Sequence, residues 1–191
     1  GSPYAGRWVA RVRGRIVAQG GTPEQALHAA QISRHKEKLE IVYMPVPISY
    51  SPLIDKVRDT LAPDQEIYLV GGAVRDMLLN RISRDLDFAV PAKGIALARR
   101  VANALQADFM VLDNERDTGR VIVTEPDGTR TFLDFAVYRG RDLDEDLRSR
   151  DFTINAIAFE LRAQTLIDPL NGGSDLRAKV IRACSPTSLS D

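Results

Sequence analysis

Apolar residues predominate in RWVARV at 7–12 and in RIVAQG at 15–20, and both stretches are predicted to be strands. Arg13-Gly14 between them indicates a tight turn. Thr22 and Pro23 then predict a helix to about residue 34, because threonine caps helices and proline suits the first helical position. Alternation in KLEIVYMP predicts a third strand. Residues 1–48 are therefore predicted to form a small accessory β-β-α-β module.

A proline-rich stretch, YMPVPISYSP at 43–52, disfavours a helix or a central strand and predicts a linker at 45–51. Residues 49–191 are predicted to form a second, larger domain. Apolar spacing there predicts helices at 52–62, 72–80 and 94–107, and strands at 66–71, 85–90, 108–113, 120–125 and 130–137. Residues 151–161 are predicted to be helical first and extended later, and 175–179 and 180–184 to be short elements.

This order of elements favours a mixed α+β fold with helices packed on one side of the sheet. The adjacent strands near 119–137, joined by Glu125-Pro126-Asp127-Gly128, imply an antiparallel portion. His28 and His35 are predicted to be exposed helix residues without a chemical role.

The composition is that of a globular protein, with 44% hydrophobic and 27% charged residues. No apolar run approaches the roughly 18 residues that predict a membrane span, and no signal peptide is recognisable. Cys184 is the single cysteine, so no internal disulfide can form. These features predict a cytoplasmic protein without a membrane partner.

Charge is distributed unevenly although the chain is neutral overall. Residues 1–50 carry a net charge of +4 and residues 51–191 a net charge of −4. The basic residues of the first segment allow two interpretations, a nucleic-acid contact or an ordinary solvated face.

The most informative stretch is LVGGAVRDMLLNRISRDLDFAV at 69–90. Gly71 and Gly72 follow a predicted strand and open a helix, so a phosphate can approach the backbone N–H groups there, and Arg75 lies one turn further on. Asp85 and Asp87 alternate on a strand, which places both carboxylates on one face about 6–7 Å apart. Such oxygen ligands suit Mg²⁺. Alone, each signal also fits a surface turn or surface charges; together they indicate a site for a nucleoside triphosphate with Mg²⁺.

Asp134, in RTFLDFAVYRG, is the candidate for a third carboxylate. It lies in an apolar strand, where an acid is costly unless it is paired or metal-bound. Alternation places it on the face opposite Leu133 and Phe135. The other interpretation is an acid on the solvated face of an edge strand.

Four stretches occur in an order that resembles a known family: LVGGAVRDMLL, SRDLDFAV, DLRSRDFTINAIAF and LIDPLNGGSDLRAKVIR. From about residue 52 to 188 the chain is similar to the catalytic head of the class II tRNA nucleotidyltransferases (CCA-adding enzymes) and bacterial poly(A) polymerases. Both belong to the DNA polymerase β-like superfamily. The resemblance implies template-independent addition of nucleotides from CTP and ATP to a tRNA 3′ end, with Mg²⁺ as cofactor.

By motif, the resemblance implies that Asp85 and Asp87 bind the catalytic metals and that Asp134 is the third carboxylate. Gly71, Gly72 and Arg75 match the triphosphate-binding turn. The motif associated with recognition of the ribose and sugar phosphate corresponds to Arg150, Asp151 and Asn155. From the residues themselves, Arg150 and Asp151 are also predicted to form an ion pair, with Asp151 as N-cap of the following helix.

Two departures from the family pattern stand out. Ser149 precedes Arg150 where relatives often have a second arginine. The sequence also ends where relatives continue into helical neck, body and tail regions, so we expect a truncated or isolated head that lacks most of the tRNA-binding surface. A poly(A) polymerase of the same family and a non-catalytic nucleotide-binding or assembly module remain alternatives; a dinucleotide-dependent oxidoreductase is disfavoured by the glycine spacing.

Overall fold

The computed structural model describes residues 1–33 and 36–188. The helices and strands are β1 (Arg7–Val12), β2 (Arg15–Gly20), α1 (Pro23–Ile32), β3 (Glu40–Met44), α2 (Pro52–Asp59), β4 (Tyr68–Val70), α3 (Gly72–Leu78), β5 (Asp85–Val90), α4 (Gly94–Leu105), β6 (Asp108–Asp113), β7 (Thr118–Thr124), β8 (Arg130–Val137), α5 (Leu143–Arg148), the 3₁₀ helix η1 (Thr153–Asn155), β9 (Ala158–Glu160), β10 (Thr165–Ile167) and α6 (Gly172–Ala178).

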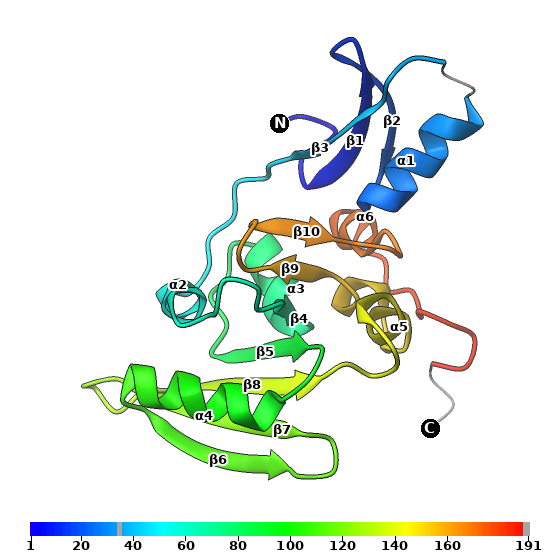
Figure 1. Ribbon diagram of the computed structural model, residues 1–191. Helices are drawn as coiled ribbons and strands as arrows, with labels where there is room; N and C mark the ends of the chain where they lie inside the picture. The colour runs from blue at the N-terminus through cyan, green and yellow to red at the C-terminus, as the bar shows by residue number, and fades with distance from the viewer. Residues whose placement is uncertain (34–35, 189–191) are drawn as a thin grey trace.

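The N-terminal elements have the predicted β-β-α-β order. The three strands form an antiparallel sheet in the order β2-β1-β3, and α1 lies beside it (Figure 1). Thr22 caps α1 as predicted, since its side chain accepts a hydrogen bond from the Gln25 N–H. His28 is exposed on α1, whereas the prediction for His35 lies outside the described residues.

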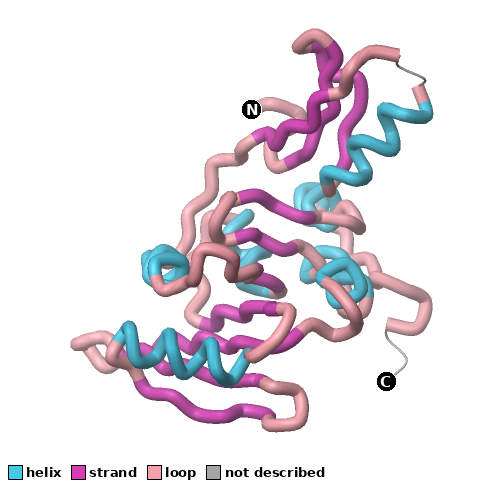
Figure 2. Tube along the Cα trace, in the orientation of Figure 1, coloured by secondary structure: helices cyan, strands magenta, loops and turns pink. Residues whose placement is uncertain are grey.

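The remaining strands form one seven-stranded sheet in the order β10-β9-β4-β5-β8-β7-β6. β5 and β8 run parallel, and every other neighbouring pair of described strands is antiparallel. The strands lie side by side in one continuous sheet, and the helices lie next to it (Figure 2). The Gly128 N–H donates to the Glu125 carbonyl in the predicted turn between β7 and β8. The predicted mixed α+β fold is confirmed.

Alternating residues of the central strands contribute to two separate hydrophobic clusters. Leu69, Phe88 and Phe159 belong to the larger cluster, to which α2, α3 and α4 also contribute. Their neighbours Val70, Ala89 and Ala158 belong to a smaller cluster that contains Leu147 of α5. Successive residues of a strand point to opposite faces, so α5 packs on the face opposite α4. The prediction that helices pack on one side is therefore wrong for α5.

Two elements, α5 and β10, were not predicted from the sequence. α5 is only 6 residues long and β10 only 3, so neither gives a clear periodic pattern. α5 depends instead on polar signals at its start, where the Asp142 side chain accepts from the Glu145 N–H and acidic residues fill the first turn. In residues 151–161 the predicted helix is only the single turn η1, followed by the expected strand β9.

The N-terminal module is held against β10 and the loop that follows it. The indole N–H of Trp8 donates to the Leu166 carbonyl at 2.9 Å, and the Asp168 N–H donates to the Gly21 carbonyl at 2.9 Å. Residues 45–51 contain neither helix nor strand and lead from the module to α2 (Figure 1). The boundary between two domains near residue 48 stays a prediction. None of the helices in the described ranges combines the length and the apolar character needed to cross a membrane.

Candidate active site

The glycine turn lies where β4 ends and α3 begins. Gly71 has φ +71° and ψ −145°, a conformation that side-chain-bearing residues rarely adopt. A Cβ at this position would lie 3.5 Å from Asp87 Oδ2 and 3.4 Å from Arg150 Nη1. The turn, a carboxylate of β5 and the guanidinium of Arg150 thus meet around one backbone position, although they are far apart in the sequence.

Asp85 and Asp87 point to the same face of β5, the face that also carries Ala89 of the smaller cluster. Asp87 is paired with Val70 of β4 on one side and with Asp134 of β8 on the other. Loss of hydration in this crowded position raises the pKa of Asp87, and the neighbouring carboxylates of Asp134 and Asp85 raise it further, although Arg150 opposes the rise. The carboxyl groups of Asp85 and Asp87 offer only oxygen donors, and a cation bound between them would favour their ionised form.

Asp134 points away from the buried face of β8, as predicted, because Leu133 and Phe135 on either side are fully buried. Its two carboxylate oxygens accept hydrogen bonds from Arg120 of β7, both at 2.7 Å. Asp134 therefore lies beside Asp87 in the sheet, but its carboxylate is bound by the guanidinium group of Arg120.

Arg75, Asp151 and Asn155 form a continuous hydrogen-bonded group. Arg75 Nη1 donates to Asn155 Oδ1 at 3.0 Å, and Asn155 Nδ2 donates to Asp151 Oδ1 at 3.3 Å. A Cβ at Gly72 would lie 3.3 Å from Arg75 Nη2. This chain of contacts connects α3 of the glycine turn with the segment around η1, so both predicted nucleotide-binding motifs belong to one site.

The predicted ion pair between Arg150 and Asp151 is wrong. Arg150 instead donates to Asp146 of α5 through Nε and Nη2, at 3.1 and 2.8 Å, and Asp146 is buried. Asp151 is also not the N-cap, because Phe152 holds that position before η1, which has no side-chain cap. The pattern that indicates the true pair is the i, i+4 spacing of Asp146, on the short helix α5, and Arg150, two residues past its end. The apolar spacing did not reveal this helix.

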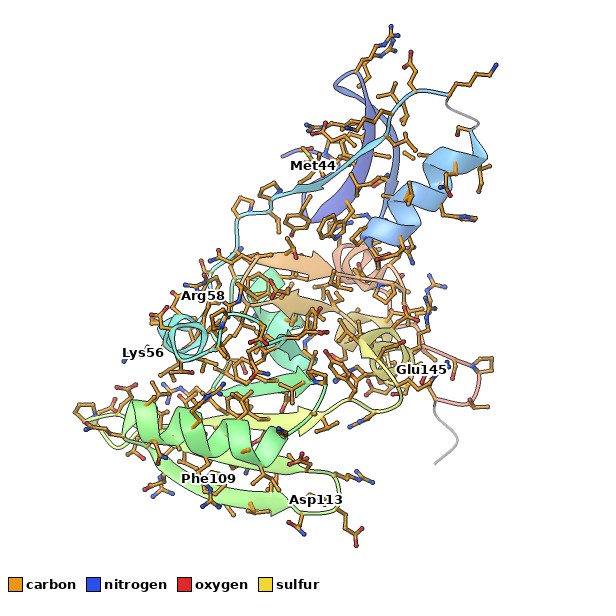
Figure 3. All side chains as sticks on the ribbon, in the orientation of Figure 1. Met44, Lys56, Arg58, Phe109, Asp113 and Glu145 are labelled. Atoms are coloured by element: carbon orange, nitrogen blue, oxygen red, sulfur yellow. The ribbon has the colours of Figure 1, made fainter. Side chains whose placement is uncertain are left out.

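A solvent-open cavity of about 1110 Å³ lies beside Asp87 and Asp134, whereas Asp85 and the predicted nucleotide-binding residues do not line it. Asp87 and Asp134 line it together with Tyr138 and Arg116, as does Asp113, labelled in Figure 3 at the end of β6. Its volume is ample for a nucleotide-sized ligand.

Sequence reasoning missed two residues that contact the predicted site, Arg120 and Asp146. Arg120 lies between the buried residues Gly119 and Val121, and this alternation indicates that its side chain points to the other face of β7. β7 pairs with β8, the strand that carries Asp134. That signal does not reveal which cross-strand partner Arg120 faces, because strand register is set in the folded sheet.

Comparison with known proteins agrees with the family resemblance found in the sequence. Residues 67–182 match the family model of the poly A polymerase head domain. The chain is 45% identical over 118 residues to the CC-adding tRNA nucleotidyltransferase of Geobacter sulfurreducens, covering 62% of this chain and 27% of that protein. It is 42% identical over 125 residues to the enzyme of the same name from Synechocystis sp., covering 64% of this chain and 29% of that protein.

A solved structure of a tRNA nucleotidyltransferase complexed with a primer tRNA and an incoming ATP analog is similar in fold. The TM-score is 0.61 at 34% sequence identity, over 71% of this chain and 40% of the other. The present chain thus spans less than a third of the length of the two curated relatives. The chain belongs to the poly A polymerase head-domain family, the catalytic head of the class II CCA-adding nucleotidyltransferases.

Proposed function

We propose that the protein adds nucleotides from CTP and ATP to the 3′ end of tRNA without a template, and that this chain contains the chemical site. The observation that carries the proposal is the meeting of Gly71, Asp87 and Arg150 around one backbone turn. It brings together the three parts that a nucleotidyl transfer site needs, namely the N–H groups of a helix start, a metal-binding carboxylate and a phosphate-binding cation.

In this proposal the turn at Gly71 and Gly72 and the side chain of Arg75 bind the triphosphate. Arg150, Asp151 and Asn155 orient the ribose and sugar phosphate, with Arg150 fixed by Asp146 and Asn155 fixed by Arg75. The two relatives named for CC addition favour a protein that adds part or all of the CCA end.

Asp85 and Asp87 fit a divalent cation, because hard carboxylate oxygens on one face are the ligands that Mg²⁺ prefers. Asp134 is the candidate third ligand, but each of its oxygens already accepts a hydrogen bond from Arg120. When bound, Mg²⁺ supplies charge stabilisation to a displacement in which the RNA 3′ hydroxyl attacks the α-phosphate and pyrophosphate leaves.

We further propose that the protein acts in the cytoplasm, and that residues 1–48 form an accessory module outside the head. The family model covers residues 67–182, which lie entirely outside this module. A poly(A) polymerase is the second candidate, because the matching family model carries that name. The product made on a tRNA that lacks its CCA end distinguishes the two, since one activity stops after a short defined addition and the other continues.

The test is calorimetric titration of the chain with ATP and with CTP, each in Mg²⁺ and in EDTA. We expect Mg²⁺-dependent binding that Asp87→Asn weakens at least tenfold, about 1.4 kcal/mol. The matched control is Asp108→Asn, which removes an exposed carboxylate of β6 outside the cavity lining and should bind normally. Equal binding in EDTA, or unchanged binding by the Asp87 variant, would refute the proposed site.

A further inference from the structure

Arg120 holds the third carboxylate in a fixed geometry. Residues Arg120 of β7 and Asp134 of β8 lie directly opposite each other in the antiparallel pair. Arg120 Nε and Nη2 each donate to a different oxygen of Asp134 at 2.7 Å, the forked arrangement that makes arginine–carboxylate pairs strong. The guanidinium carbon also lies 5.0 Å from the centre of the Phe132 ring. Arg120 is therefore fixed from two sides.

Asp134 has a positively charged neighbour on one side and a second carboxyl group on the other. On one side Arg120 faces it from β7; on the other Asp87 is its direct partner in the parallel pairing of β5 and β8. Two ionised carboxylates on adjacent strands repel each other, and the guanidinium neutralises one of them. The side chain of Asp134 is only 17% exposed and that of Arg120 29% exposed, so solvent screens this pair only partly.

The geometry also bears on metal binding. Within residues 1–33 and 36–188, no three His, Cys, Asp or Glu side chains are grouped so that they could hold a metal ion. Both oxygens of Asp134 accept hydrogen bonds from Arg120. The donors of a three-carboxylate site are thus on adjacent strands, but the third donor is already bound.

We propose that Arg120 is a positioning residue that holds Asp134 out of the metal site while no nucleotide is bound, and releases it when metal and nucleotide bind together. The proposal rests on the proposed role of Asp85 and Asp87 as metal ligands. The guanidinium and the cation compete for the same two oxygens, so the nucleotide-free chain retains a cation weakly. Phosphate oxygens that arrive with the nucleotide supply further ligands and shift the competition towards the metal.

A double-mutant cycle read by Mn²⁺ binding to the nucleotide-free chain tests this proposal, with free Mn²⁺ measured by electron paramagnetic resonance. We expect Arg120→Gln to tighten Mn²⁺ binding at least fivefold. In the Asp134→Asn background the same change should have less than a twofold effect, because no carboxylate remains to be released. Circular dichroism and thermal unfolding establish that each variant is folded, and Arg120→Lys, which keeps the charge without the fork, should give an intermediate gain.

Arg116→Gln is the matched control, because Arg116 lines the same cavity, is 82% exposed and pairs with Asp113 rather than Asp134. It should change Mn²⁺ affinity less than twofold. An equal gain in both backgrounds, or an equal gain from Arg116→Gln, would show a general charge effect and overturn the proposal. Weaker Mn²⁺ binding by Arg120→Gln would overturn it too, since Arg120 would then orient Asp134 towards the metal.

Asp87→Asn separates this proposal from the proposed function. If that variant binds Mn²⁺ as well as the unaltered chain, the metal site itself is misassigned. If it loses Mn²⁺ binding while the cycle shows no coupling between Arg120 and Asp134, only the role of Arg120 fails.

Discussion

Gly71 matters both for the backbone conformation of the turn and for the space beside Asp87 and Arg150. Its positive φ excludes most residues, and its missing side chain leaves Asp87 and Arg150 within 3.5 Å of the position that a Cβ would take. Asp85, Asp87 and Gly71 were recognisable from the sequence because alternation and a glycine after a strand are local patterns. The partner of Asp134 was not, because it depends on the register of two strands. The partner of Arg150 was not, because the short helix α5 that carries Asp146 has no clear apolar pattern.

Gly71→Ala is therefore expected to reduce both stability and nucleotide binding. The strained backbone costs about 1–3 kcal/mol of unfolding free energy, and the added methyl group narrows the approach of a phosphate to the turn. Urea unfolding and nucleotide titration measure the two effects. Gly128→Ala is the control, because Gly128 also has a positive φ but lies in an open turn with no atom near its Cβ position. Gly128→Ala should lower stability and leave nucleotide binding unchanged. A similar loss of nucleotide binding in this control would contradict the proposed role of Gly71.

Asp175 gives a prediction about pH at the same scale. Hydrogen bonds from Arg182 and then Thr153 lower the pKa of this buried carboxyl group. A lowered pKa in the folded state means that the ionised form stabilises the fold above the ordinary aspartate pKa, and that this stabilisation is lost as pH falls through the folded-state value.

Asp175→Asn is accordingly expected to lower the unfolding free energy at pH 7 by about 1–2 kcal/mol, since a charged hydrogen-bond acceptor is lost. The difference from the unaltered chain should shrink as the pH falls below 4, the region of the ordinary aspartate pKa. Chemical unfolding at a series of pH values measures it. A difference that stays constant with pH would show that the charge of Asp175 does not contribute.

At the scale of elements, the contact between the N-terminal module and the head depends on a close backbone approach. A Cβ at Gly21 would lie 1.8 Å from the Asp168 carbonyl oxygen, too close for any side chain. Asp168 is buried, and its carboxylate accepts the N–H groups of Gly172 and Gly173 at the start of α6. The module thus contacts the loop that also positions α6. The proline-rich stretch marks where the module ends but does not show which segment of the head it contacts.

We expect Gly21→Ala to separate the module from the head or to destabilise the chain by about 3 kcal/mol or more, because the backbone contact cannot form without a shift. Trp8 is the single tryptophan and donates to the Leu166 carbonyl across this contact, so its fluorescence reports docking. Emission should move to longer wavelength as the indole becomes hydrated. Gly14→Ala, in the open turn between β1 and β2, should leave the emission unchanged.

At the scale of the whole molecule, the described residues contain the proposed chemical site, whereas the curated relatives are more than three times as long as the region they share with this chain. The nine predicted site residues lie on β5, β8 and the segments around α3 and η1. In the proposed function they contact the phosphates, the metal ion and the ribose, which are the same for ATP and CTP. None of them is assigned to the base.

The chain is therefore expected to bind ATP and CTP with affinities that differ less than tenfold, about 1.4 kcal/mol. Competition of each nucleotide for the Mg²⁺-loaded chain measures the ratio. A larger preference for one nucleotide would place base selection within the head. A chain extended to the length of the relatives is the comparison, and we expect it to discriminate more strongly.

The sequence by itself determined the features that local geometry controls. Alternating apolar positions identified most of the strands, and glycine, proline and threonine marked turns and a helix start, because these residues restrict the backbone within a few positions. The motifs around Gly71 and Asp87 also indicated their ligand chemistry, since the spacing of two carboxylates on one strand does not depend on the rest of the fold.

Only the tertiary structure decided which charges pair. Arg150 pairs with Asp146 and not with Asp151, because the short helix α5 places Asp146 beside it. Asp134 pairs with Arg120, because strand register places the two residues opposite each other. The same applies to α5, which packs on the second face of the sheet, and to the module that docks beside β10. The sequence therefore predicted the parts of the proposed site, and packing fixed their partners.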